Sequence, residues 1–177
     1  QHSYSRQACA EPLKRTPDGG FQQAEVTSCG LNGGPLDGIG EDEARLARHP
    51  WSKHGGAPYD KRFNKKEHPY FTPSGRDGDP AAVQYIANMR DGSVCGFKYF
   101  QMRGAKAIRC AVSGGCRGNI EVSDTPEFST LAASIPVEAG KTMTNVTAPF
   151  YMADGVKALY FRFRGEGAMN FFAFELS

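Results

Sequence analysis

Ala158-Leu-Tyr-Phe-Arg-Phe-Arg164 alternates apolar and polar side chains, and this stretch decides the fold class. Successive side chains of a β-strand point to opposite faces, so the pattern predicts a half-buried strand with Leu159, Phe161 and Phe163 facing inward. A second strand pattern, Met169-Asn-Phe-Phe-Ala-Phe-Glu-Leu176, follows after a short break that contains two glycines. The C-terminal part of the chain is therefore predicted to be β-structure.

Further strand patterns precede these two, separated by Gly, Pro, Asn and Asp. They cover 83–86, 96–102, 106–112, 118–123, 131–137 and 145–150. In 106–112 the alternation places Ile108, Cys110 and Val112 on one face, and a Gly114-Gly115 turn predicts pairing with 118–123. About eight strands at roughly ten-residue spacing predict an all-β, two-sheet antiparallel β-sandwich of the jelly-roll type.

The N-terminal part of the chain carries less regular patterns. Residues 1–20 are polar and predict a lead-in linker or a strap packed on the domain, and 21–27 predicts the first strand of a module that spans 21–177. Residues 28–80 are rich in glycine, proline and charge, which predicts a long irregular loop with a functional purpose. One short helix is expected near 41–48, where acidic residues lead and basic ones end the segment.

Charge and hydropathy exclude two classes of function. The formal net charge of the 177 residues is only +2, which is weak for a nucleic-acid-binding protein. The sequence contains no run of 18 apolar residues, so it predicts no membrane-spanning helix.

The five cysteines leave two interpretations open. Cys110 and Cys116 flank the Gly114-Gly115 turn, and a hairpin there would bring them within disulfide reach, which implies an oxidising compartment. Alternatively, all five are small buried apolar residues. Their spacing matches no zinc-binding pattern.

Four segments, in order, resemble family 6 carbohydrate-binding modules. Gln22-Gln-Ala-Glu25 resembles the opening strand of these modules, and Tyr85-Ile-Ala-Asn-Met-Arg-Asp-Gly-Ser-Val94 resembles their Gly-Tyr-Ile segment. Ala158–Gly165 and Asn170-Phe-Phe-Ala-Phe174 resemble their last two strands. Residues 27–36 and 85–92 also look like the C-terminal region of some family 43 glycoside hydrolases, which carry such a module after a five-bladed propeller. This chain lacks the propeller, to which the hydrolytic chemistry belongs.

The resemblance implies where a sugar would bind. Tyr85 falls where these modules keep a stacking tyrosine, and Thr142 stands where they carry a second, tryptophan partner. Asn170 aligns with an aspartate of the closing strand, and Ala168 stands where these modules carry a ligand-binding asparagine. The family's structural calcium implies Gln23 and Glu25 as oxygen ligands near the first and last strands.

The long loop offers residues that suit sugars by their own chemistry. Aromatic rings cover the C–H side of a pyranose, and fixed polar groups bind its hydroxyls. Trp51, the single tryptophan, and Tyr70 are candidates for stacking, and Arg76 and Asp77 are candidates for hydrogen bonding. The alternatives are a loop anchor for the aromatic residues and a solvated turn for the charged ones.

We therefore expect a non-catalytic module that binds a polysaccharide or oligosaccharide, in an extracellular or periplasmic protein that carries a catalytic domain or another protein partner. A structural or protein-interaction β-sandwich with a degenerate sugar site is the alternative. An enzyme built on the long loop is a third interpretation, because Glu41, Asp42 and Glu43 are close in sequence. However, glycoside hydrolysis needs two carboxylates across a cleft, which this spacing does not predict.

Overall fold

The computed structural model describes residues 10–56, 67–76, 79 and 81–177. Strands dominate these residues, and none of the described helices is long and apolar enough to cross a membrane. The elements are β1 (Leu36–Asp37), β2 (Gly40–Glu43), η1 (Ala44–Leu46, a 3-10 turn), β3 (Arg48–Ser52), β4 (Gly55–Gly56), β5 (Tyr70–Pro73), β6 (Gln84–Met89), β7 (Val94–Met102), β8 (Ala107–Ser113), β9 (Cys116–Ser123), β10 (Ala133–Ala139), β11 (Thr144–Pro149), β12 (Gly155–Gly167) and β13 (Met169–Leu176).

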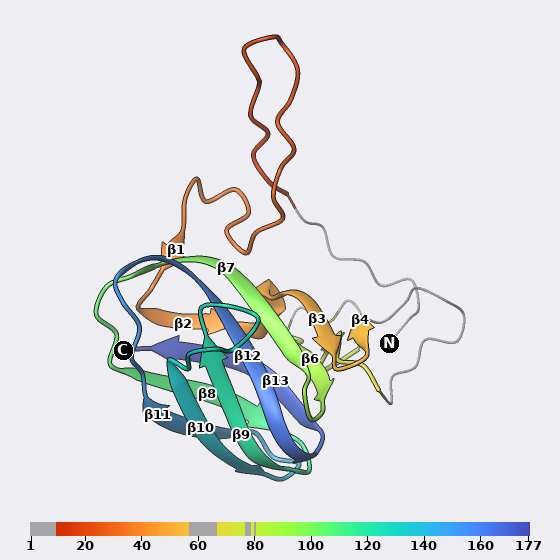
Figure 1. The fold of residues 1–177 in the computed structure, drawn as a ribbon. Coiled ribbons are helices and arrows are strands. Elements are labelled where there is room, and N and C mark those ends of the chain that lie inside the picture. The colour runs from red at the N-terminus through yellow and green to blue at the C-terminus, as the bar shows by residue number, and fades with distance from the viewer. Residues whose placement is uncertain (1–9, 57–66, 77–78, 80) are drawn as a thin grey trace.

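Two packed sheets form a β-sandwich, as the sequence predicts (Figure 1). The seven-stranded sheet has the order β10-β9-β12-β7-β3-β4, and β1 pairs with β7 in the parallel sense. The six-stranded sheet has the order β11-β8-β13-β6-β5, and β2 pairs with the far half of β13. All pairs except β1–β7 are antiparallel.

The core lies between the sheets and is rich in phenylalanine. Leu159, Phe161 and Phe163 are fully buried, which confirms the predicted inward face of β12. The Phe161 ring lies 4.8 Å from the Phe174 ring and 5.1 Å from the Phe171 ring, so β12 and β13 meet across the sandwich. Burying each such ring contributes about 1.5–3 kcal/mol to stability.

The chain crosses from one sheet to the other at Gly114-Gly115, and the predicted hairpin there is wrong. β8 belongs to the six-stranded sheet, whereas β9 belongs to the seven-stranded one. A Cβ atom on Gly114 would lie 2.2 Å from the Ala168 carbonyl oxygen, and its φ of +107° is open only to glycine. The backbones of β12–β13 and of the crossover therefore come too close for any side chain at Gly114.

The same crossover rules out the predicted Cys110–Cys116 disulfide. Cys110 stands opposite Val146 and Phe174 in one sheet, and Cys116 stands opposite Ala139 and Gly167 in the other. Both are free, buried thiols, as is Cys95, and Cys29 is free and half-buried. Cys9 lies outside the described residues.

The segment 21–56 differs from its prediction in three ways. Residues 21–27 form no strand beyond one bridge between Arg15 and Phe21. The predicted helix at 41–48 is instead the end of β2, η1 and the start of β3. Within the predicted irregular loop 28–80, the described residues contribute the short strands β1 to β5. β2 and β3 extend the open edges of β13 and β7, and these ladder hydrogen bonds outweigh the helix-like order of charges.

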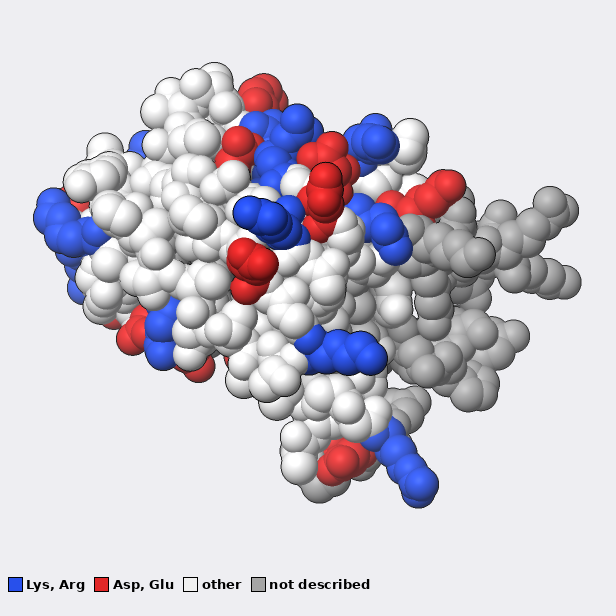
Figure 2. Space-filling model, turned by 90° about the horizontal axis from the view of Figure 1, so that it is seen from below, with Lys and Arg blue, Asp and Glu red and all other residues white. Residues whose placement is uncertain are grey.

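Charged side chains of both signs are interspersed on the face that Figure 2 shows, as expected from the small net charge. Ion pairs among the described residues include Arg162–Glu121 at 2.7 Å and Lys157–Asp124 at 3.3 Å.

Candidate functional site

Tyr85 and Phe172 form a stacked pair on the outer face of the six-stranded sheet. Tyr85 comes from β6 and Phe172 from β13, and their ring centroids lie 4.5 Å apart with planes inclined by 24°. Both side chains are half-buried, while their chain neighbours Ile86 and Phe171 point into the core. The pair therefore presents a partly exposed apolar platform.

Tyr70 adds a third aromatic ring to the same face. In the β5–β6 ladder Thr72 stands opposite Tyr85 and Tyr70 stands opposite Ala87, so Tyr70 is the diagonal neighbour of Tyr85. Burial, and to a smaller extent Tyr70, raises the pKa of the Tyr85 hydroxyl. Tyr85 therefore stays a neutral hydrogen-bond donor at physiological pH. We call Tyr70, Tyr85 and Phe172 the aromatic face.

Asn170 supplies a fixed amide two residues before Phe172. Its Nδ2 donates to the Ser113 hydroxyl at 3.3 Å, and its Oδ1 accepts from the Asn88 backbone N–H at 3.3 Å. Asn88 itself has a φ of +61°, a left-handed conformation that asparagine tolerates better than most residues. Each amide atom of Asn170 keeps capacity for one more hydrogen bond, so the group can still meet a ligand hydroxyl.

An ion-pair group borders the aromatic face further along β13. Arg109 of β8 donates to Glu175 of β13 and, at 3.4 Å, to Glu41 of β2. All three side chains are partly exposed and lie on neighbouring strands of the same sheet. They provide charged hydrogen-bonding groups at one border of the face.

Trp51 does not join Tyr85. It lies in β3 of the opposite sheet, where its ring meets that of Tyr160 edge-on at 6.3 Å. Together with Val94 and Phe128 it forms a small apolar cluster separate from the core. Trp51, a predicted stacking candidate, therefore lies on a different sheet from Tyr85.

The charged residues near the end of the predicted loop 28–80 lie at or near the turn that connects β5 and β6. Ser74 and Val83 close this hairpin by hydrogen bonds in both directions, and Arg76 and Asp79 lie exposed within it. Tyr85 stands opposite Thr72, four residues before Arg76, in the two strands that this turn connects. Asp77 lies outside the described residues.

Thr142 and Ala168, the two positions at which this sequence departs from the family 6 pattern, lie at the same end of the sandwich. The Gly140 carbonyl, two residues before Thr142, accepts from the Gly114 N–H at 2.7 Å, and the Gly115 carbonyl accepts from the Ala168 N–H at 3.2 Å. Thr142 is exposed. The end of the sandwich where the resemblance implies tryptophan and asparagine therefore carries small side chains here.

Glu25 is engaged in a different way from the predicted calcium site. Its carboxylate accepts from Lys98 Nζ and from the Tyr99 hydroxyl, both at 3.0 Å, and these bonds lower its pKa. It thus lies beside β7 rather than beside the last strand, and Gln23 is exposed. Among the described residues no three His, Cys, Asp or Glu side chains gather as metal ligands. Calcium binding by Gln23 and Glu25 stays a prediction.

Phe172 is the site residue that sequence reasoning missed. A β-bulge between Phe171 and Ala173 shifts the register of β13 against β8, so simple alternation does not reveal which phenylalanine points outward. The polar neighbour Asn170, two positions earlier on the same face, is the signal that could have identified it.

Solved structures share this fold. A family 6 carbohydrate-binding module from Clostridium stercorarium, solved with cellobiose, has a TM-score of 0.61 and 18% identity, covering 82% of this chain and 98% of that one. A β-1,3-glucan-binding module of the same family from Bacillus halodurans has a TM-score of 0.62 and 16% identity, covering 81% and 98%.

The chain has the fold of a family 6 carbohydrate-binding module. A family 43 arabinoxylan arabinofuranohydrolase from Bacillus subtilis contains the same fold, with a TM-score of 0.61 and 19% identity over 93% of this chain and 32% of that one.

The sequence also matches a longer curated protein. A xylosidase/arabinosidase from Thermoclostridium stercorarium is 38% identical over 176 residues, which is 98% of this chain. The chain spans 37% of the length of that relative. No protein-family model matches the chain.

Proposed function

We propose that this module binds a polysaccharide or oligosaccharide at the aromatic face and performs no hydrolysis itself. The observation that carries the proposal is the stacked Tyr85–Phe172 pair, with Tyr70 beside it and the fixed amide of Asn170 at its edge. This combination provides an apolar platform for a sugar ring and polar groups for its hydroxyls. The carbohydrate-binding neighbours in fold support it.

The carboxylates near the aromatic face argue against hydrolysis there. Glu41 and Glu175 are both ion-pair partners of Arg109, so neither is a free carboxylate. Burial, and to a smaller extent Asp37, raises the pKa of Asp42 to about 6, but Asp42 alternates with Glu41 and so points away from this face. A general acid opposite a free carboxylate is not assembled from these residues.

The setting of the module is part of the proposal. The curated relative and the Bacillus subtilis enzyme are both glycoside hydrolases by description, and each is much longer than this chain. We place the module in a glycoside hydrolase that acts outside the cytoplasm, where plant and microbial polysaccharides occur. There it would hold the enzyme near its substrate.

A screen by affinity gel electrophoresis tests the proposal and names the ligand class. The panel should contain arabinoxylan, xylan, β-1,3-glucan and a soluble cellulose derivative. We expect retardation in at least one gel, with a dissociation constant of about 10–1000 μM because one or two stacking contacts contribute only about 1 kcal/mol each. Tyr85→Ala should migrate without retardation, and Tyr151→Ala, at an exposed tyrosine outside the aromatic face, should behave as wild type.

A structural or protein-interaction module is the second candidate. It is favoured by the small residues Thr142 and Ala168 at the end of the sandwich where the resemblance implies sugar-binding groups. If no gel retards the protein and circular dichroism shows an intact fold, the result favours this second function over glycan binding.

A further inference from the structure

A hairpin-shaped arm, residues 10–27, projects from the sandwich in Figure 1, where it is drawn in red and orange at the top. Its two halves are joined by a tight turn, Thr16-Pro-Asp-Gly-Gly20, in which proline, aspartate and glycine each suit their turn positions. Gln22 N–H donates to the Lys14 carbonyl at 2.8 Å, and Thr16 N–H donates to the Gly20 carbonyl at 3.0 Å. The arm is therefore a defined hairpin.

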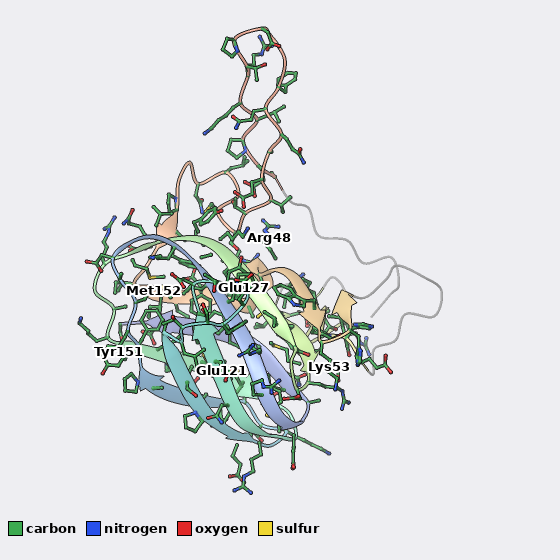
Figure 3. All side chains as sticks on the ribbon, in the orientation of Figure 1. Arg48, Lys53, Glu121, Glu127, Tyr151 and Met152 are labelled. Carbon is green, nitrogen blue, oxygen red and sulfur yellow. The ribbon has the colours of Figure 1, made fainter. Side chains whose placement is uncertain are left out.

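The base of the arm is anchored firmly on the sandwich. The Glu11 carboxylate accepts from the Thr27 backbone N–H at 2.7 Å and pairs with Arg48 of β3 at 3.5 Å. Figure 3 labels Arg48 where the arm meets the sandwich. Ser28 then exchanges hydrogen bonds with Lys98 of β7 in both directions. These contacts fix the direction in which the arm leaves the domain.

The arm exposes apolar side chains from its tip to its base. Phe21 is 60% exposed and Leu13 is 57% exposed, and Val26 is also exposed. The Arg15 guanidinium lies 5.7 Å from the Phe21 ring, within cation–π distance. A two-stranded hairpin without packing on either face is marginally stable in water, and a group of exposed apolar residues commonly marks a binding surface. The arm is therefore a candidate binding surface.

The comparisons favour one kind of partner. Three isolated family 6 modules align with 80–82% of this chain, whereas the whole Bacillus subtilis enzyme aligns with 93% at a similar TM-score. The alignment with the whole enzyme therefore includes a larger share of this chain than these three alignments with isolated modules. The described residues outside the sandwich on its N-terminal side are 10–35, which include the arm. The match to the Thermoclostridium stercorarium relative, which covers 98% of the chain, also extends through the arm.

We infer that the arm is a docking element for the catalytic domain of a glycoside hydrolase, with Leu13, Phe21 and Val26 buried in that interface. Arg15 holds the Phe21 ring at the tip, and the Glu11–Arg48 pair fixes the angle of approach. The inference rests on the proposed attachment of the module to a glycoside hydrolase and does not depend on glycan binding at the aromatic face.

Hydrogen–deuterium exchange of the arm amides tests this inference. The probe is a chimera in which this chain replaces the 176 matched residues of the Thermoclostridium stercorarium protein. The N–H groups of Thr16, Gly19 and Gln22 bond only within the hairpin, so they should exchange fast in the 177-residue chain alone. In the chimera we expect their exchange to slow about tenfold or more, while β12 amides exchange equally in both proteins.

Two variants of the chimera locate the effect. Phe21→Ser should abolish the protection of the arm, whereas Tyr151→Ser, at a side chain 74% exposed on the sandwich, should leave it unchanged. Tyr151 lies well away from the arm in Figure 3. If the chimera does not fold, the same experiment on the unmodified relative should show slow exchange in its segment aligned with 10–27.

Three results would overturn the inference. The first is fast exchange of the arm amides in a chimera whose β12 amides are protected. Fast exchange of the aligned segment in the unmodified relative counts as the same result. The second is protection of the arm in the isolated chain by xylotriose or cellobiose, which would make it a glycan contact. The third is protection that grows with the concentration of the isolated chain, which would make it a contact between copies. Only the second result bears on glycan binding, so failure of this inference and failure of the proposed function are distinguishable.

Discussion

The rings of Tyr85 and Phe172 stack at 4.5 Å on the outer face of the six-stranded sheet, although 86 positions separate the two residues in the sequence. The pairing of β6 with β13 brings them together, and Ile86 opposite Phe171 sets the register of this contact. The stacking surface is thus fixed by the central strands of the sheet, which are more rigid than a loop. This rigidity reduces the entropy lost on binding a sugar ring.

Gly114→Ala should destabilise the fold strongly, whereas Gly115→Ala should be nearly neutral. A Cβ at Gly114 would overlap the Ala168 carbonyl, and its φ of +107° is strained for alanine, while a Cβ at Gly115 meets open space. We expect a loss of at least about 2 kcal/mol for the first variant. Urea unfolding of the pair measures it, and equal midpoints would contradict the crossover geometry.

Asp42→Asn should stabilise the protein at neutral pH but not at pH 4. Burial, and to a smaller extent Asp37, raises the pKa of Asp42 from 3.8 to about 6, so the folded state binds a proton more tightly than the unfolded state. Stability therefore falls as pH rises from about 4 to about 6, and asparagine removes that loss. After discounting for partial exposure we expect about 1 kcal/mol at pH 7. Thermal unfolding at both pH values measures it; a gain of the same size at pH 4 would show that charge is not the cause.

Calcium at Gln23 and Glu25 predicts that a chelator lowers the melting temperature, because an ion that binds only the folded state stabilises it. Differential scanning calorimetry with and without EDTA is the measurement. Glu25→Ala should remove the sensitivity, and Lys98→Ala should keep it. No response of the wild type to EDTA would leave Glu25 with its Lys98 and Tyr99 contacts alone.

Thr142→Trp should tighten glycan binding about tenfold, which corresponds to about 1.4 kcal/mol. Thr142 is exposed at the end of the sandwich where the resemblance implies a second aromatic residue, so an indole there would have space. Isothermal titration with the ligand from the gel screen measures the gain. Thr142→Ala is the control and should bind as wild type; an unchanged affinity of the tryptophan variant would show that this end of the sandwich takes no part in binding.

The strands that the sequence predicted well are those buried on one face. β12 and the inner face of β8 follow simple alternation, and Phe161, Phe163, Ile108 and Val112 are all fully buried. β2 and β3 were missed because each is short and lies beside the edge of a longer strand, and because the segment 41–48 carries charges in a helix-like order. The Gly114-Gly115 pair is equally compatible with a hairpin and with a crossover, and only the long-range contact with Ala168 decides between them.

The candidate site was predictable in part. Tyr85, Tyr70 and Asn170 all lie on the outer face of one sheet, as a shared sugar site requires. Trp51 was grouped with them because the segment 28–80 showed no regular pattern, so its division between two sheets was not visible. Which sheet a short strand joins depends on non-local pairing, and local sequence does not encode this directly.

The most direct test of the account is a double-mutant cycle of glycan affinity at Tyr85 and Phe172. Isothermal titration of the wild type, Tyr85→Ala, Phe172→Ala and the double variant should give non-additive losses, because either substitution removes half of one stacked platform. Each single variant should lose at least about tenfold in affinity, and Tyr85→Phe should keep most of it. Wild-type affinity in both single variants, with the fold intact, would contradict the central claim that this stacked pair binds the sugar.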